Sequence, residues 1–178
     1  MGTKTILTLV GGISKNSLNQ KLFYAVQDQA PEGLEVKRFD ISTLPFFSQD
    51  IENNPPPSVR DFKNQIEQAQ AILFITPEYN RSIPGVLKNA IDWGSRPHGQ
   101  NAWTKKPAGV MGASMGAIGT FGAQNHLRQI LSALNIRTMP QPDFYLNGSK
   151  SFDENGKLTD DRTKEFIKKY WAAFSEWI

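Results

Sequence analysis

Residues 71–93 read AILFITPEYNRSIPGVLKNAIDW, and this stretch decides the fold. It begins with a continuously apolar, partly β-branched run, which predicts a strand over residues 71–76 that is buried on both faces. Pro77 ends the strand because it has no backbone N–H for the sheet ladder. Helical spacing resumes over residues 86–93, after a Pro-Gly pair. Residues 78–82 therefore form a loop that is pinned at both ends near the sheet edge, an arrangement that suits ligand binding.

The same alternation of strand and helix runs along the whole chain. Strands are predicted at residues 5–10, 34–39, 71–76, 108–111 and 136–139, and helices at residues 18–30, 59–70, 86–93, 122–134 and 162–178. Five such units predict one α/β domain over residues 1–178, a three-layer sandwich around a parallel five-stranded sheet of order 2-1-3-4-5. Ligands of such sheets bind beyond the carboxyl ends of strands one and three, where the strand order reverses.

The composition excludes several classes of function. The chain is 39% hydrophobic and 21% charged, and it contains no run near the roughly 18 apolar residues that a membrane helix needs. We therefore expect a cytoplasmic protein without a membrane partner. Because there is no cysteine, disulfides, thiolate metal sites and cysteine nucleophiles are excluded. The net charge of +3 comes from scattered residues and does not predict nucleic-acid binding, although it favours anionic substrates weakly.

A second special loop follows the first predicted strand, where residues 11–19 read GGISKNSLN. It opens onto a helix, whose free N–H groups and positive dipole end favour an anion. The spacing matches neither the dinucleotide fingerprint nor a Walker A loop, whereas the serines and Asn19 fit a single phosphate. A cap of the helix by Ser17 explains the same residues equally well, so both interpretations stay open here.

Taken together, the two loops resemble the NADPH-dependent FMN reductase family, which includes bacterial quinone, chromate and azo-dye reductases of flavodoxin-like fold. The most specific match is PEYN at residues 77–80, continued by LKNAIDW at 87–93. Further matches are SMG at 114–116 and HLRQIL at 126–131, so the resemblance covers nearly the whole chain. It implies an enzyme that passes a hydride from NADPH or NADH through FMN to a small-molecule acceptor. The acceptors implied are a quinone, an azo compound, a chromate-like oxidant or free flavin.

The resemblance also implies a homodimer or homotetramer. The alternative is a flavin-binding electron carrier, or a redox-sensing interaction protein, without turnover of its own. Flavodoxin carriers tend to be acidic, so the basic balance of this chain and its pinned PEYN loop favour the reductase.

The family's first loop commonly reads Gly-Ser-x-Arg-x-x-Ser-x-Asn and binds the FMN phosphate. Here Ser17 and Asn19 match, while Gly12 replaces the serine, Ser14 replaces the arginine and Lys15 keeps a positive charge nearby. The FMN contacts that the resemblance implies are Gly12, Ser14, Lys15, Ser17, Leu18, Asn19, Pro77, Glu78, Tyr79, Asn80, Ser114, Met115 and Gly116. No protein residue is assigned a catalytic role, because the flavin supplies the electron chemistry.

Other residues near these loops have competing interpretations. Glu78 could act as a general acid or base, but a carboxylate that holds its own turn or a partner subunit is favoured. Tyr79 could contact the flavin or only cover apolar surface. Arg81 is predicted to meet an anionic group of the nicotinamide cofactor or substrate, or else to lie in a subunit contact. Trp103 is predicted to help form a substrate lid.

A rival motif is GASMG at residues 112–116, which matches the G-x-S-x-G elbow of serine hydrolases. A hydrolase triad of that fold requires an acidic residue and then a histidine after the serine. The only histidine after Ser114 is His126, and no acidic residue lies between them. The sequence therefore argues against a hydrolase. His126 and His98, without a carboxylate cluster, also make a weak case for a metal site.

Overall fold

The computed structural model describes residues 2–178, and every predicted strand and helix is present within them. The elements are β1 Lys4–Val10, α1 Leu18–Asp28, β2 Leu34–Phe39, α2 Pro57–Gln68, β3 Ala71–Ile75, α3 Gly85–Ser95, β4 Pro107–Ser114, α4 Phe121–Ala133, β5 Arg137–Thr138, β6 Tyr145–Asn147 and α5 Asp161–Trp177. Three short 3₁₀ turns complete the list, namely η1 Ile41–Thr43, η2 Gln49–Ile51 and η3 Gly148–Lys150. Within the described part of the chain, no helix has both the length and the apolar character that crossing a membrane requires.

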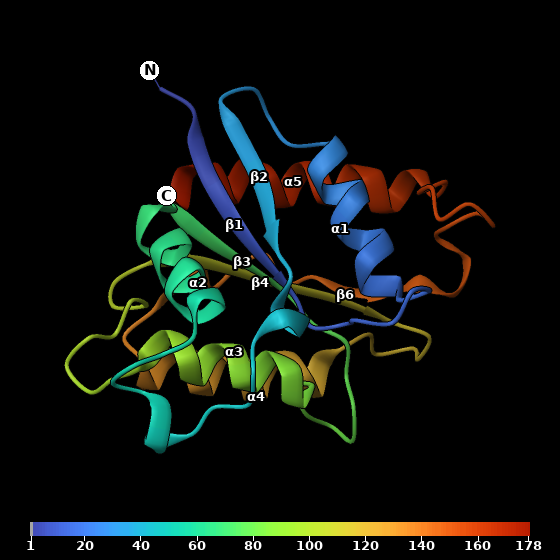
Figure 1. The fold of residues 1–178 in the computed structure, drawn as a ribbon. Coiled ribbons are helices and arrows are strands. Elements are labelled where there is room, and N and C mark those ends of the chain that lie inside the picture. Colours follow the sequence, from blue (N-terminus) through green and yellow to red (C-terminus); the bar gives the residue numbers. More distant parts are fainter. Residues whose placement is uncertain (1) are drawn as a thin grey trace.

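The sheet is parallel and has the strand order β2-β1-β3-β4-β5, which confirms the predicted topology (Figure 1). β1 lies between β2 and β3, with Ile6 paired to both Val36 and Ala71. Since all of these strands run the same way, the carboxyl ends of β1, β3 and β4 meet at one edge. The loops singled out in the sequence all leave the sheet from that edge.

The prediction of five strands was incomplete, because a sixth strand completes the outer edge. β5 pairs with the first two residues of β4, and β6 pairs with Gly112 to Ser114 at its far end. Between them the chain leaves the ladder at Pro140 and Pro142, neither of which has an N–H to donate. The strand predicted at residues 136–139 therefore shrinks to two residues, and a later segment of three takes its place.

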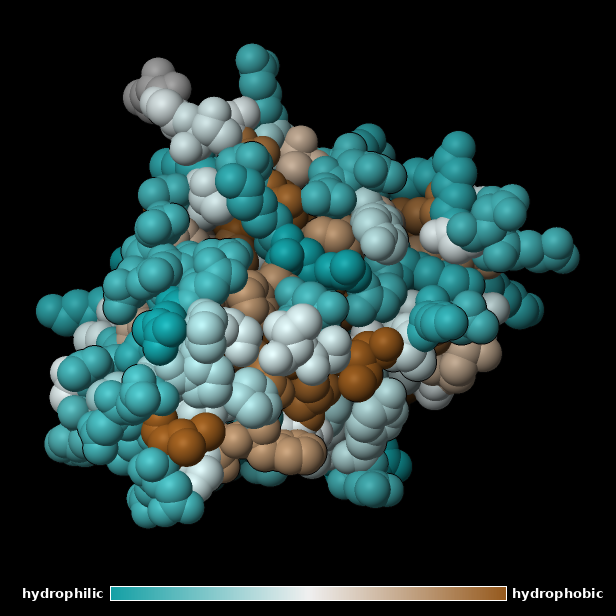
Figure 2. Space-filling model, viewed as in Figure 1, coloured by the Kyte–Doolittle hydropathy of each residue, from teal (hydrophilic) through white to brown (hydrophobic). Residues whose placement is uncertain are grey.

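Helices cover both faces of the sheet and create two separate cores. α2, α3 and α4 pack on one face, and α1 and α5 pack on the other (Figure 1). Successive side chains of β3 point to opposite faces of the sheet and so enter both cores. Ile72 and Phe74 lie in the core beneath α2, α3 and α4, whereas Leu73 and Ile75 lie in the core beneath α1 and α5. All four side chains are fully buried. On the side of the molecule shown in Figure 2, the surface is largely hydrophilic and has a few separate hydrophobic patches.

Candidate active site

Three loops meet at the carboxyl edge of the sheet. We call them the first loop (residues 11–17, after β1), the second loop (76–84, after β3) and the third loop (115–120, after β4). Gly11 brings the first two together, since a Cβ there would lie 2.9 Å from Pro84 Cγ and 3.2 Å from Pro77 Cδ. The convergence predicted from strand order is thus confirmed by the close packing of Gly11 in the first loop against Pro77 and Pro84 in the second, which lie 66 and 73 residues further along the chain.

The first loop presents exposed side chains at a helix start. Ser17 caps α1, because its Oγ accepts a hydrogen bond from the Asn19 N–H at 3.2 Å. Gly12 makes room for this hydroxyl, since a Cβ at Gly12 would lie only 2.1 Å from Ser17 Oγ. Ser14 and Lys15 are exposed to solvent. The helix cap therefore exists, and it leaves the hydroxyl hydrogen of Ser17 free for a ligand.

Asn19 does not present its side chain to a ligand, which corrects its predicted role. It is 2% exposed, and its Nδ2 donates to the Ala113 carbonyl while its Oδ1 accepts from the Ala113 N–H, both at 2.9 Å. Both ends of its amide therefore hold α1 against β4. The Leu18 side chain also packs inward, since a Cβ at Gly148 would lie 3.1 Å from Leu18 Cδ1. The main-chain N–H of Leu18 remains the group that this residue can offer to an anion.

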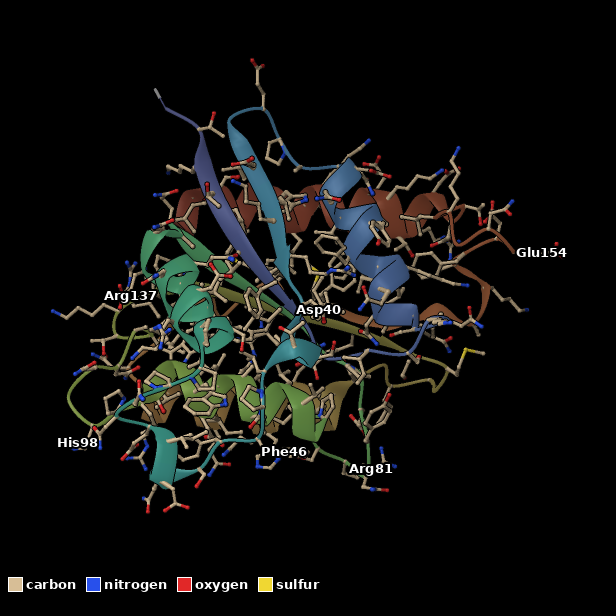
Figure 3. All side chains as sticks on the ribbon, in the orientation of Figure 1. Asp40, Phe46, Arg81, His98, Arg137 and Glu154 are labelled. Atoms are coloured by element: carbon tan, nitrogen blue, oxygen red, sulfur yellow. The ribbon has the colours of Figure 1, made fainter. Side chains whose placement is uncertain are left out.

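A tight turn shapes the second loop. The Tyr79 N–H donates to the Ser82 carbonyl at 3.0 Å, and the Ser82 N–H donates to the Tyr79 carbonyl at 2.9 Å. Between them Asn80 and Arg81 have φ values of 51° and 63°, as the two central residues of a type I′ turn require. Left-handed φ is unfavourable for arginine, so surrounding contacts must hold the turn. Arg81 lies on the loop that precedes α3 and points outward (Figure 3).

Glu78 fixes this turn to α4, which agrees with the structural role favoured from the sequence. Its Oε2 accepts from the Ala123 N–H at 3.0 Å, and its Oε1 is 3.1 Å from Arg81 Nη1. Its side chain is only 10% exposed and lies at the positive end of the α4 dipole. Gly122 leaves room for it, since a Cβ there would lie 3.1 Å from the carboxylate. Glu78 thus acts as the cap of a helix 45 residues further along the chain.

The third loop is closed by Ser114, the last residue of β4. Ser114 Oγ donates to the Gly119 carbonyl at 2.6 Å and accepts from the Gly116 N–H at 3.1 Å. His126 lies elsewhere, with its Nδ1 2.7 Å from Ser82 Oγ, so these two residues do not form a hydrolase pair. The loop runs over β6, because a Cβ at Gly119 would lie 2.7 Å from the Tyr145 carbonyl carbon. Burial raises the pKa of the Tyr145 hydroxyl.

Trp103 is not a lid, so this prediction was wrong. The ring is fully buried against Phe62 and Phe74, at centroid distances of 5.9 and 6.0 Å, and its Nε1 donates to the Ile91 carbonyl at 2.9 Å. His98 lies at the opposite end of α3 from Arg81 and far from the loops (Figure 3). Across residues 2–178, no group of three or more His, Cys, Asp or Glu side chains could hold a metal ion.

The second and third loops enclose one pocket with a volume of about 280 Å³. Its lining consists of Glu78, Asn80, Arg81, Ser114, Gly116, Ile118 and Gly119. Four of these residues are FMN contacts that the family resemblance implies, and Arg81 is the predicted cofactor or substrate contact. Ile118 in this lining is 53% exposed, and its neighbours in the loops, Met115 and Tyr79, are exposed apolar side chains at 66% and 54%. The pocket thus combines a fixed polar interior with an apolar rim, which suits a flat aromatic ligand.

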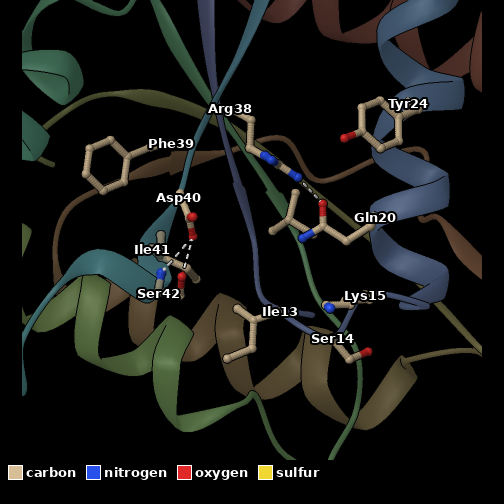
Figure 4. Close-up of a pocket in the computed structure, with 11 residues that line it drawn as sticks. Ile13, Ser14, Lys15, Gln20, Tyr24, Arg38, Phe39, Asp40, Ile41 and Ser42 are labelled. Carbon is tan, nitrogen blue, oxygen red and sulfur yellow. Dashed lines mark hydrogen bonds between the residues drawn. The ribbon is translucent and has the colours of Figure 1, made fainter.

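A further cleft beside the first loop contains residues that the sequence analysis missed. It has a volume of about 250 Å³ and lies between the first loop, α1 and the carboxyl end of β2 (Figure 4). Arg38 and Gln20 line it, together with Lys15. The predicted strand order already indicates a place for Arg38. Because β2 neighbours β1 in that order, Arg38, the last polar residue of β2, should lie near the first loop.

Comparison with known proteins identifies the family. Residues 5–151 match the model of the family described as NADPH-dependent FMN reductase. A quinone reductase of Pseudomonas putida is 44% identical over 176 residues, which cover 98% of this chain and 94% of that protein. A 2-hydroxy-1,4-benzoquinone reductase of a Burkholderia species is 41% identical, with 97% and 95% covered.

Solved structures agree with this assignment. The flavoenzyme FerB of Paracoccus denitrificans, an NAD(P)H:(acceptor) oxidoreductase, superimposes with a TM-score of 0.92 at 41% identity, covering 98% of this chain and 97% of FerB. A flavodoxin of Pseudomonas aeruginosa has a TM-score of 0.61 at 17% identity over 96% of this chain and 99% of its own, and it shows the fold alone. The chain belongs to the NADPH-dependent FMN reductase family.

Proposed function

We propose that this protein is a quinone reductase that holds FMN across its three loops and uses NADPH or NADH as the electron donor. Bound FMN would supply the hydride chemistry, taking electrons from the nicotinamide and giving them to the quinone. The observation that carries the proposal is the pocket between the second and third loops, which lies at the carboxyl edge of the sheet.

The residues present fit FMN in two respects. At the first loop, the α1 N-terminus, the Ser17 hydroxyl and the Lys15 ammonium are donors for a phosphate. At the pocket between the second and third loops, Tyr79 and Met115 provide exposed apolar surface for the ring. The two places are joined by the packing of Gly11 against Pro77 and Pro84, so one elongated ligand can reach both.

The second loop is arranged so that its polar groups keep fixed directions. The turn at Asn80 and Arg81 is closed by two backbone hydrogen bonds, and Glu78 ties it to α4. Because these contacts are all made within the protein, the loop loses little conformational freedom on binding. Backbone N–H and C=O groups of residues 78–82 can then recognise the polar edge of a flavin.

Arg81 is proposed to bind an anionic group of the nicotinamide cofactor. Its side chain is 76% exposed at the rim of the pocket and is held by Glu78. An Arg81→Ala variant should raise KM for NADPH by roughly tenfold, because a charge-assisted hydrogen bond contributes about 1.5 kcal/mol or more. Arg81→Lys is the matched variant that keeps the charge. Unchanged kinetics with both NADPH and NADH would assign Arg81 to a subunit contact instead.

The quinone is proposed as the acceptor because the relatives carry that activity in their names. The Pseudomonas relative is named a quinone reductase, and the Burkholderia relative is named a 2-hydroxy-1,4-benzoquinone reductase.

We also propose that the protein works as a homodimer or homotetramer in the cytoplasm. Exposed Phe46 and Phe121 support self-association, being 88% and 51% exposed respectively. Sedimentation velocity would check the oligomer, and a monomer at micromolar concentration would refute it.

The test is an anaerobic titration of FMN-loaded protein. After unbound FMN is removed, NADPH or NADH is added while the flavin absorbance is followed, and a quinone is then supplied. We expect rapid bleaching and then recovery of the absorbance on addition of the quinone, with steady turnover in the presence of both substrates. Retained flavin that neither nucleotide reduces would support the electron carrier instead. Protein that retains no flavin would refute the proposed cofactor site.

A further inference from the structure

The turn at the tip of the second loop needs support from outside itself. Asn80 and Arg81 both have left-handed φ, and such residues persist where the surrounding contacts determine the backbone. The two backbone hydrogen bonds between Tyr79 and Ser82 close the turn, but both lie within it. They fix its shape and leave open its direction relative to the sheet. Contacts from the turn to another element must set that direction.

The helix α4 provides such contacts at both ends of the turn. Glu78, just before the turn, accepts a hydrogen bond from the Ala123 N–H at 3.0 Å. Ser82, the last residue of the turn, has its Oγ 2.7 Å from His126 Nδ1. Ala123 and His126 are three residues apart on α4, so they are neighbours on the helix surface. The turn is therefore held before and after its tip by one helix.

The bond between Ser82 and His126 can form in every state of the imidazole. A serine hydroxyl both donates and accepts, whereas Nδ1 donates or accepts according to the tautomer and donates when the ring is protonated. His126 does not line the pocket between the second and third loops, so any effect on a ligand must pass through Ser82. The imidazole is exposed, so this bond should affect the turn more than the stability of the whole fold.

We propose that His126 is a positioning residue for the pocket between the second and third loops. By holding Ser82 it fixes the far end of the turn, and the turn then presents Asn80 and Arg81 to the pocket in one direction. Glu78 fixes the near end. The inference rests on the proposed function in one respect, because the ligand that this arrangement serves is the flavin ring.

The first experiment measures hydrogen exchange at the two N–H groups that close the turn, those of Tyr79 and Ser82, by NMR of the flavin-free, full-length protein. It compares the wild type with His126→Ala and His126→Asn. The asparagine amide reaches about as far as His126 Nδ1 and can also donate or accept. The control is Gln129→Ala. Gln129 is exposed one turn further along α4, so this change also places alanine in the helix but leaves the Ser82 bond intact.

His126→Ala should speed exchange at both N–H groups by roughly threefold to tenfold, the factor that one net hydrogen bond gives. Ser82→Ala should give the same increase, and the double variant should add nothing further, because both changes remove one bond. His126→Asn should exchange more slowly than His126→Ala, and Gln129→Ala should match the wild type. Unchanged exchange in His126→Ala, no difference between the two His126 variants, or full additivity with Ser82→Ala would overturn the proposal.

The second experiment titrates the same proteins with FMN and with riboflavin, which lacks the phosphate. His126→Ala should weaken the binding of both by the same factor, roughly threefold to tenfold, because the turn serves the ring that the two ligands share. His126→Asn should recover affinity for both. A loss confined to FMN, or unchanged affinity for both flavins despite faster exchange, would overturn the positioning of the pocket by His126.

Failure of the proposed function would look different, because the wild type itself would bind neither flavin. The exchange rates need no ligand, so they still decide whether His126 holds the turn. Faster exchange in His126→Ala that His126→Asn reverses would support that role, and equal rates in all variants would overturn it.

Discussion

The first and second loops border the same site, yet different kinds of contact hold them. The second loop is shaped by its own sequence, because Pro77 and Pro84 bound it and the Tyr79 and Ser82 backbones close the turn. The first loop depends on side chains outside it, with Asn19 bonded to Ala113 across 94 residues and Gln20 bonded to the Gly12 carbonyl. A loop can thus be rigid through local chemistry or through tertiary contacts, and only the first kind is visible in a short stretch of sequence.

The largest expected effect comes from breaking the tertiary support of the first loop. Asn19→Ala would leave the buried N–H and C=O of Ala113 without their partner, which should lower the free energy of unfolding by about 3 kcal/mol. Asn16→Ala, at an exposed position of the same loop, is the control and should change it by less than about 0.5 kcal/mol. Urea denaturation of flavin-free protein measures both, and equal midpoints would refute the anchoring role of Asn19.

The second loop should be sensitive where Glu78 attaches it to α4. Glu78→Ala removes the cap of α4 and the partner of Arg81, so the free energy of unfolding should fall by about 2 kcal/mol. Arg81→Ala leaves the cap in place and should cost less than about 0.5 kcal/mol, since an exposed ion pair contributes little. Thermal or urea denaturation of the two variants provides the comparison. A loss for Arg81→Ala as large as that for Glu78→Ala would contradict the capping role.

A smaller effect is expected where Gly12 and Ser17 compete for space. Gly12→Ala should displace the Ser17 hydroxyl from its cap and cost about 1 kcal/mol, the usual value of an N-cap. In a Ser17→Ala background the cap is already absent, so the same change at Gly12 should cost clearly less. The double-mutant cycle measures this coupling. Strict additivity of the two changes would show that the hydroxyl does not occupy the space beside Gly12.

The smallest effect is expected at Asp160, which caps α5. This cap joins residues close in sequence, so it can be compared with the long-range cap of α4 by Glu78. Hydrogen bonds from Thr163, three residues along α5, hold the pKa of the Asp160 carboxyl below 3.8. A folded pKa below the unfolded one stabilises the protein at pH values above 3.8, and this contribution disappears as the pH falls through the folded pKa. The stability difference between wild type and Asp160→Asn should therefore shrink below pH 3.8. Denaturation midpoints at neutral and acid pH check this, and a constant difference would contradict it.

The sequence predicted most of the fold because hydrophobic periodicity and strand order are regular features. All five helices, the parallel order and the meeting of the loops followed from them. β6 escaped prediction because three residues, YLN, carry too little periodicity, and their pairing with β4 depends on a detour through Pro140 and Pro142.

The shape of the loops was predicted well where local chemistry determines it and poorly where distant packing does. The pinned loop at residues 78–82 fell into the first class. Asn19 and Trp103 fell into the second, because a polar amide and an indole look available until their partners on β4 and α3 are known. The predicted strand order places the end of β2 near the first loop, but the link of Arg38 to that loop runs through Gln20 on α1, which strand order alone does not predict (Figure 4).

The central claim is that the three loops together form the flavin site, and amide shifts report on it directly. We would titrate ¹⁵N-labelled, flavin-free protein with FMN and follow the backbone N–H signals by NMR. The account predicts changes concentrated in residues 11–18, 78–82 and 114–119. Changes that gather in another part of the molecule, for example around residues 155–168, or no change at all, would contradict it.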